Sequence, residues 1–118
     1  MPVPPAIPAA LLLLAQAPAE FQAVESLRRF TAMRTAAELC LAVPPAAAEQ
    51  AAAHEKGLVR LAGMEIAARG EAPAALAERL AGLEAGVREQ VRAKGCADPT
   101  IRFLTDRFGQ AYGLGGKS

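Results

Sequence analysis

The sequence is poor in the side chains that most active sites use. It has one histidine, and its serines and aspartates number two each, at Ser26, Ser118, Asp98 and Asp106. A Ser-His-Asp site would need Ser26, His54 and an aspartate near the C-terminus to converge, and no motif spacing favours this. The H-E-x-x-H zinc motif needs a second histidine, which the sequence lacks. We therefore expect no catalytic residue, no metal site and no cofactor, so the chain is not expected to be an enzyme.

Aromatic residues are also scarce. Tryptophan and asparagine are absent and aromatics make up 4% of the chain, whereas alanine occurs 29 times and the hydrophobic fraction is 53%. That fraction is too high for an intrinsically disordered chain. A core of Leu, Val, Met and Ala suits helices, because alanine has the highest helix propensity.

Neither sign of charge predominates. Thirteen basic and 12 acidic residues give a formal net charge of +1, and the two signs alternate along the chain. A nucleic-acid-binding protein usually carries a basic patch or stripe. We therefore predict no nucleic-acid partner.

The first nineteen residues, MPVPPAIPAALLLLAQAPA, contain no charged side chain. Their apolar core, about residues 6–15, is shorter than the roughly 20 residues that span a bilayer, so no stable membrane span is expected. Ala17, Pro18 and Ala19 form a small-x-small cleavage pattern. Residues 1–19 are predicted to be a signal peptide. The alternative is a flexible N-terminal arm on a cytoplasmic protein.

Proline and glycine divide the rest of the chain into helical segments. Gly95 suits a helix C-cap, and Asp98 followed by a proline suits an N-cap and a first turn. The predicted helices run from Glu20 to Leu41, from Pro45 to Arg69, from Pro73 to the residue before Gly95, and from Pro99 to Tyr112. The sequence thus predicts an all-α bundle of about four helices, with one domain over residues 20–112 and a flexible tail over 113–118.

Apolar residues recur along each segment at spacings of mostly three and four, which places them on one helix face. The four faces are Phe30, Met33, Ala37, Cys40 and Leu41; Ala47, Ala51, His54, Leu58 and Leu61; Leu76, Leu80, Leu83, Val87 and Val91; and Ile101, Leu104, Phe108 and Tyr112. Gly82 and Gly86 lie together on a small-residue flank, which favours a tight contact with another helix inside the bundle.

Several polar residues have a structural interpretation. His54 shares the apolar stripe of its helix, so we expect it to be partly buried and structural. Glu65 and Arg69 are four residues apart, as are Glu84 and Arg88, and both pairs are expected to form ion pairs on the surface.

The two cysteines are predicted to form a disulfide. Cys40 lies at the end of the first predicted helix, and Cys96 lies in the turn after the third. In an up-down bundle the first and third helices end at the same end of the bundle, so the two cysteines are expected to lie close together. A disulfide is the normal state of such a pair in an oxidising compartment. It would close a loop of about 57 residues and stabilise the fold by about 4 kcal/mol. It also conflicts with a catalytic role for Cys40 alongside His54.

The C-terminal stretch AYGLGGKS resembles a phosphate-binding loop in spacing only. Gly116, Lys117 and Ser118 match the pattern G-x-x-x-x-G-K-[ST], but Ala111 stands in place of its first glycine. The motif needs a strand before it and a helix after it, whose N-terminal dipole holds the phosphate. Here a helix is predicted before it. We expect the tail to bind no nucleotide.

Together these features indicate an exported protein, periplasmic or secreted, that acts as an accessory module by binding another protein. A carrier of a small apolar ligand is the alternative, and an enzyme is third. A carrier would need a lined cavity, whereas an interaction module would show an exposed apolar patch. The oligomeric state is left open.

The leader generates the first testable prediction. Protein recovered from its native host should have the intact mass of a chain that begins at Glu20, because Ala17 and Ala19 provide the cleavage pattern. Mass spectrometry of the envelope and cytosolic fractions measures this. The full 118-residue mass in the cytosolic fraction would contradict export.

Overall fold

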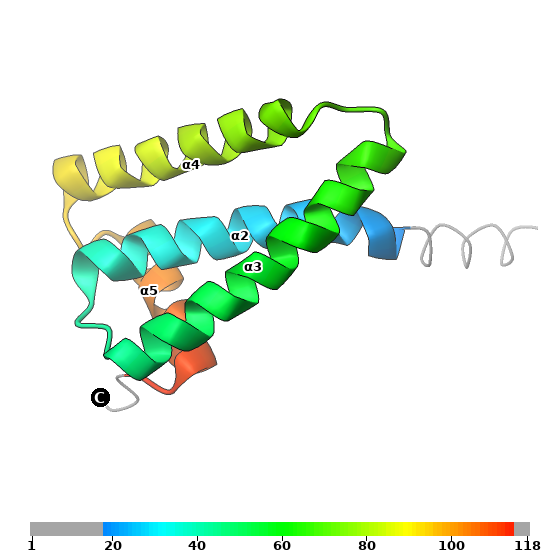
Figure 1. Ribbon diagram of the computed structural model, residues 1–118. Helices are drawn as coiled ribbons and strands as arrows, with labels where there is room; N and C mark the ends of the chain where they lie inside the picture. Colours follow the sequence, from blue (N-terminus) through cyan, green and yellow to red (C-terminus); the bar gives the residue numbers. More distant parts are fainter. Residues whose placement is uncertain (1–17, 115–118) are drawn as a thin grey trace, which may run out of the picture.

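The computed structural model describes residues 18–114 of the chain. Over this range the chain forms four helices, α2 (Pro18–Cys40), α3 (Pro45–Ala68), α4 (Pro73–Lys94) and α5 (Pro99–Tyr112) (Figure 1). The predicted all-α bundle is confirmed, and the helix bounds differ from the predicted ones by at most two residues. Most of the predicted signal peptide, residues 1–17, and the last four residues of the tail lie outside the described residues.

Proline and cap residues define the helix ends as expected. Each of α3, α4 and α5 begins at a proline, whose missing N–H would have no partner in the first turn. The Asp98 carboxylate accepts hydrogen bonds from the backbone N–H groups of Thr100 and Ile101, at 3.1 and 3.3 Å. Gly95 ends α4 with a backbone φ of 86°, a conformation that side-chain-bearing residues rarely adopt.

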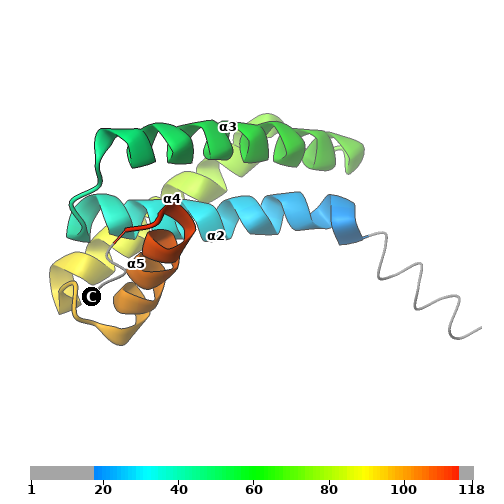
Figure 2. The ribbon, with the colours of Figure 1, turned by 90° about the horizontal axis from the view of Figure 1, so that it is seen from below.

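Helix α2 is the centre of the fold. It contacts all three other helices, and these contact one another much less. Figures 1 and 2 show α3 running along one side of α2, while α4 and α5 pack on its other sides. The buried residues of α2 accordingly lie on several sides of the helix rather than on the single face predicted: Val24, Leu27, Phe30, Thr31, Thr35, Ala36 and Ala37.

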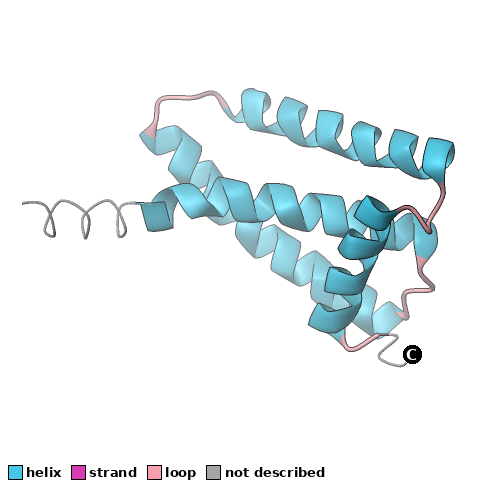
Figure 3. Cartoon of the chain, turned by 180° about the vertical axis from the view of Figure 1, so that it is seen from behind, coloured by secondary structure: helices cyan, strands magenta, loops and turns pink. Residues whose placement is uncertain are grey.

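The fourth helix covers only part of α2. Helix α5 has 14 residues against the 23 of α2. Figures 2 and 3 show it crossing α2 steeply, beside the C-terminal half of α2. The N-terminal half of α2 therefore lacks this neighbour.

The buried side chains form three clusters, and α2 contributes to each of them. Val24 and Leu27 pack with residues of α3 and α4; Phe30 and Ala37 pack with residues of α3 and α5; Ala36 packs with residues of α4 and α5. The partners in these clusters are Ala62, Ile66 and Leu76; Ala51 and Phe108; and Val87 and Ile101.

The predicted face of α3 is wrong at His54, which is exposed, and at Leu61. Leu61 is 53% exposed, and the buried positions are Ala62, Glu65 and Ile66. An α-helix turns by about 100° per residue, so a step of three residues from Leu58 leads to the flank, whereas steps of four stay against α2.

Glu65 is also not the surface residue that was predicted. Its ion pair with Arg69 is present, but Glu65 is only 4% exposed. Glu65 Oε1 accepts a hydrogen bond from the backbone N–H of Val24 at 3.1 Å. The carboxylate therefore links the C-terminal end of α3 to the N-terminal part of α2. The other predicted pair, Glu84 with Arg88, is present at 4.0 Å.

The predicted tight contact at Gly82 and Gly86 is absent. Both glycines are exposed, and a Cβ added to either would meet no atom of another helix within 4 Å. The apolar face of α4 is thus only partly buried against the other helices. Leu76 and Val87 are buried, whereas Leu80, Leu83 and Val91 are half-buried.

Cys40 and Cys96 lie at disulfide-bond distance, as predicted. Their sulfur atoms are 1.97 Å apart and their Cα atoms 5.7 Å apart. The pair joins the end of α2 to the turn between α4 and α5. It therefore fixes the position at which α5 begins.

The second prediction concerns this pair. Reducing it should lower the melting temperature by on the order of 15 °C or more, because the chain-entropy model assigns about 4 kcal/mol to a loop of this length. Calorimetry of the oxidised and reduced protein measures the shift. Non-reducing peptide mapping should show one Cys40–Cys96 link. Two thiols that alkylate readily in the native protein would refute the pairing.

The third prediction concerns Glu65. Glu65→Ala should lower the free energy of unfolding by about 1–3 kcal/mol, because it leaves the Val24 N–H and the Arg69 guanidinium without this acceptor. Glu65→Gln should lower it less, since its amide oxygen can still accept from Val24. Urea unfolding measures both changes. The control is Glu49→Ala on the exposed side of the same helix. Equal effects of Glu65→Ala and Glu49→Ala would contradict the proposed link.

Candidate functional site

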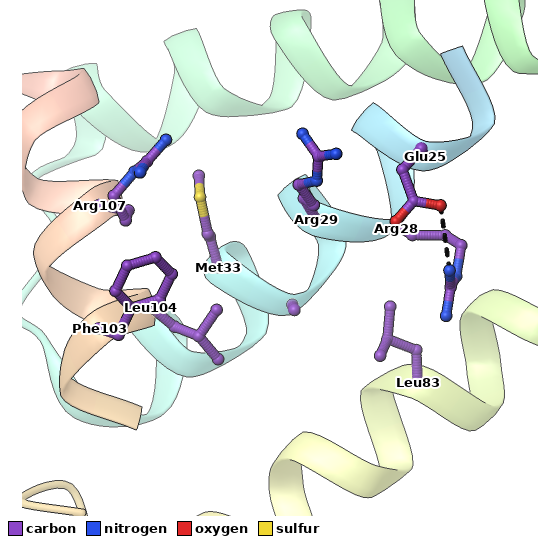
Figure 4. A pocket seen from close by; sticks show the side chains of 9 residues that line it. Glu25, Arg28, Arg29, Met33, Leu83, Phe103, Leu104 and Arg107 are labelled. Atoms are coloured by element: carbon purple, nitrogen blue, oxygen red, sulfur yellow. Dashed lines mark hydrogen bonds and ion pairs between the residues drawn. The ribbon is translucent and has the colours of Figure 1, made fainter. Parts of the chain in front are cut away.

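One of several hollows on the described surface is an open groove between α2, α4 and α5. It has a volume of about 500 Å³. It lies along the stretch of α2 that α5 leaves uncovered (Figure 4). Its lining residues are Glu25, Arg28, Arg29, Ala32 and Met33 of α2, Leu83 of α4, and Phe103, Leu104 and Arg107 of α5.

The floor of the groove is apolar and continuous with the core. Met33 packs against the cluster around Phe30, and Ala32 and Leu104 pack against the cluster around Ala36. Phe103 projects from α5 with 59% of its surface exposed, although it is one of only five aromatic residues in the chain. An exposed aromatic side chain next to an apolar floor is typical of a binding surface.

The rim of the groove is basic. Arg28 forms an ion pair with Glu25 at 3.2 Å. Arg29 and Arg107 have no ion pair with any residue in the described part of the chain. The Arg107 guanidinium lies over the Phe103 ring, with Cζ 5.6 Å from the ring centroid, a cation–π contact. Three arginines against one carboxylate leave the groove with a net charge of +2.

A second crevice adjoins this groove through Arg28 and Leu83. It is lined also by Arg69 and Arg79, and its volume is about 480 Å³. Both of these arginines form ion pairs with Glu71, and Arg79 does so at 2.7 Å. The charge of the second crevice is therefore largely compensated, in contrast to the rim of the groove.

The densest cluster of charges lies elsewhere and is structural. Arg34 of α2 donates two hydrogen bonds to Glu55 of α3, at 2.8 and 3.1 Å, and one to Glu84 of α4, at 2.7 Å. It also contacts Glu38 at 3.3 Å. Burial lowers the pKa of Arg34, but the hydrogen bonds with Glu84 and Glu55 outweigh it and raise that pKa above its ordinary value. Through this one guanidinium the cluster joins α2, α3 and α4.

The single histidine is more exposed than expected. His54 lies on the exposed part of α3, where Nδ1 shares a hydrogen bond of 3.0 Å with Tyr112 Oη. Its ring also meets Phe30 edge-on, with centroids 5.1 Å apart. Desolvation raises the pKa of Tyr112, with a further contribution from the negative charge of Glu55. His54 therefore joins α3 to α5, but at the surface, which corrects the prediction of partial burial.

The residues considered for catalysis do not form a site with one another in the described structure. Over residues 18–114, no hydrogen bond links Ser26, His54, Asp98 and Asp106 to one another. Asp98 is bonded instead to the start of α5 and to Gln90, whose Nε2 donates to it at 3.1 Å. Within residues 18–114, no group of three or more His, Cys, Asp or Glu side chains could hold a metal ion. None of the described helices is sufficiently long and apolar to cross a lipid bilayer.

The described part of the AYGLGGKS stretch continues or ends a helix. Ala111 and Tyr112 belong to α5, and Gly113 terminates it with a φ of 69°. Gly116, Lys117 and Ser118 lie outside the described residues. The absence of nucleotide binding stays a prediction.

Comparison with family models, with curated proteins and with solved structures found no match to this chain.

Sequence reasoning did not identify the groove. It assigned Met33, Leu83 and Leu104 to helix faces inside the core, and it assigned no role to Phe103 and Arg107. One signal was present, because Phe103 lies off the apolar face formed by Ile101, Leu104, Phe108 and Tyr112. A large aromatic residue on the polar side of a short helix indicates an exposed contact.

Proposed function

We propose that this chain is an exported accessory protein that binds a segment of another protein in the groove between α2, α4 and α5. The observation that carries the proposal is the exposed Phe103 beside an open apolar floor. Exposed aromatic anchors surrounded by a polar rim are a common feature of protein-binding surfaces. Export is supported by the signal-peptide pattern and by the cysteine pair at disulfide-bond distance.

The shape of the groove favours a protein over a small apolar ligand. Its volume of about 500 Å³ lies within the range of small-molecule pockets, so volume alone does not discriminate. Such pockets, however, bury most of the ligand surface. This groove is open, and Phe103 on its wall is more than half exposed. A protein segment is large enough to cover the open side of the groove and to bury the exposed part of Phe103.

Site-specific photocrosslinking tests the proposal. A photoreactive amino acid is placed at Phe103 or at Leu83 in the full chain, which is expressed in its native host. The matched control is Met64, an apolar residue of α3 that lies outside the groove and is 64% exposed. We expect the same discrete protein adduct from positions 103 and 83 and none from position 64, because only the first two line the groove.

Other outcomes would contradict the proposal. Adducts with lipids alone would favour the carrier. An adduct from position 64 but not from 103 would place the interface on α3. Absence of any protein adduct from 83 and 103 would remove the support for a protein partner.

A further inference from the structure

We propose that the segment bound in the groove is an amphipathic helix with acidic side chains beside its apolar stripe. This inference rests on the proposed function of the groove as a protein-binding site, and it adds the chemistry of the partner. Three properties of the groove lead to it: its helical walls, its apolar floor and its uncompensated positive charge.

The walls favour a helix over an extended strand. The residues that line the groove all lie within α2, α4 and α5, where backbone N–H and C=O groups bond along the helix. An extended segment binds best when it can add to the edge of a sheet, and residues 18–114 form no strand. A helix satisfies its own backbone groups and needs only a surface for its side chains.

The floor matches the apolar stripe of such a helix. Figure 4 shows Met33 between Arg29 and Arg107, with Phe103 next to Arg107 and Leu83 facing them from α4. The apolar atoms thus form a strip with arginines beside it. An amphipathic helix places residues at spacings of three and four on such a strip.

The charges of the groove arginines indicate which residues flank the apolar stripe of the partner helix. Arg28 is already paired with Glu25, so its charge is compensated within the groove. Arg29 and Arg107 have no ion pair in the described structure, and they lie on either side of Met33 (Figure 4). The cation–π contact keeps Arg107 beside Phe103, so a side chain that covers Phe103 lies close to this guanidinium. Carboxylates at these positions complement both charges.

Two designed peptides of equal length test the inference. Both carry leucine at positions i, i+3, i+4 and i+7, and they differ only in having glutamate or glutamine beside the leucines. Calorimetric titration into the oxidised full chain at low salt should give about tenfold tighter binding of the glutamate peptide, a ratio expected for two exposed ion pairs. The preference should decrease with added salt.

Matched variants locate the effect. Arg29→Gln combined with Arg107→Gln should abolish the tenfold preference. Arg60→Gln combined with Arg102→Gln removes the same charge from exposed arginines outside the groove and should leave the preference unchanged. Melting temperatures confirm that both variants fold.

Each remaining outcome overturns the inference in a distinct way. Equal binding of the two peptides, lost in Leu83→Glu, would leave the groove as a protein site but would exclude an acidic partner. Absence of peptide binding while photocrosslinking from position 103 persists would overturn the helical partner alone. Absence of both peptide binding and photocrosslinking from position 103 would overturn the proposed function as well. Tighter binding of decanoate than of the glutamate peptide would assign the groove to anionic amphiphiles.

Discussion

The groove depends on how α5 is attached to the rest of the molecule. An isolated helix of 14 residues is marginally stable in water, so α5 needs tertiary contacts to hold its place. The Cys40–Cys96 pair fixes its start against the end of α2, and Phe108 and Tyr112 pack its other end against α2 and α3. Because α5 carries Phe103, Leu104 and Arg107, the same attachment positions one wall of the groove.

The groove is also a consequence of unequal helix lengths. Helices α3 and α4 are long enough to follow α2, whereas α5 crosses it at one end. Polar contacts hold the long helices in place: Arg34 joins α2, α3 and α4, and Glu65 joins the far end of α3 to α2. The contact between Arg34 and Glu84 holds α4, one wall of the groove, against α2. An uncovered apolar strip thereby persists in a folded chain without exposing the core.

Much of the fold could be predicted from the sequence, because local signals determine it. Proline, glycine and Asp98 mark the helix ends, and the repeat of apolar residues separates helices from loops. The proximity of Cys40 and Cys96 could be predicted because the first and third helices of an up-down bundle end on the same side. Features that depend on the relative placement of helices could not be predicted. The burial of Glu65, the exposure of His54 and the open flank at Gly82 depend on how helices cross, which no repeat within one helix encodes.

The candidate site belongs to this second group. Met33, Leu83 and Leu104 follow the apolar repeat of their helices, and the repeat is the same whether a neighbour covers them or not. Only the short length of α5 and its steep crossing leave them open. Phe103 lies off the apolar face of α5, but Leu39, Val59 and Met64 also lie off the predicted faces of their helices, so this local signal does not single out the groove.

The measurement that tests the account most directly is a map of amide chemical-shift changes when the glutamate-bearing peptide is added to the isotopically labelled, oxidised chain. The account predicts that the changes concentrate at residues 25–33 of α2, around Leu83 of α4 and at residues 103–107 of α5. Changes centred on Leu61 and Met64 of α3, or none in the groove, would contradict it.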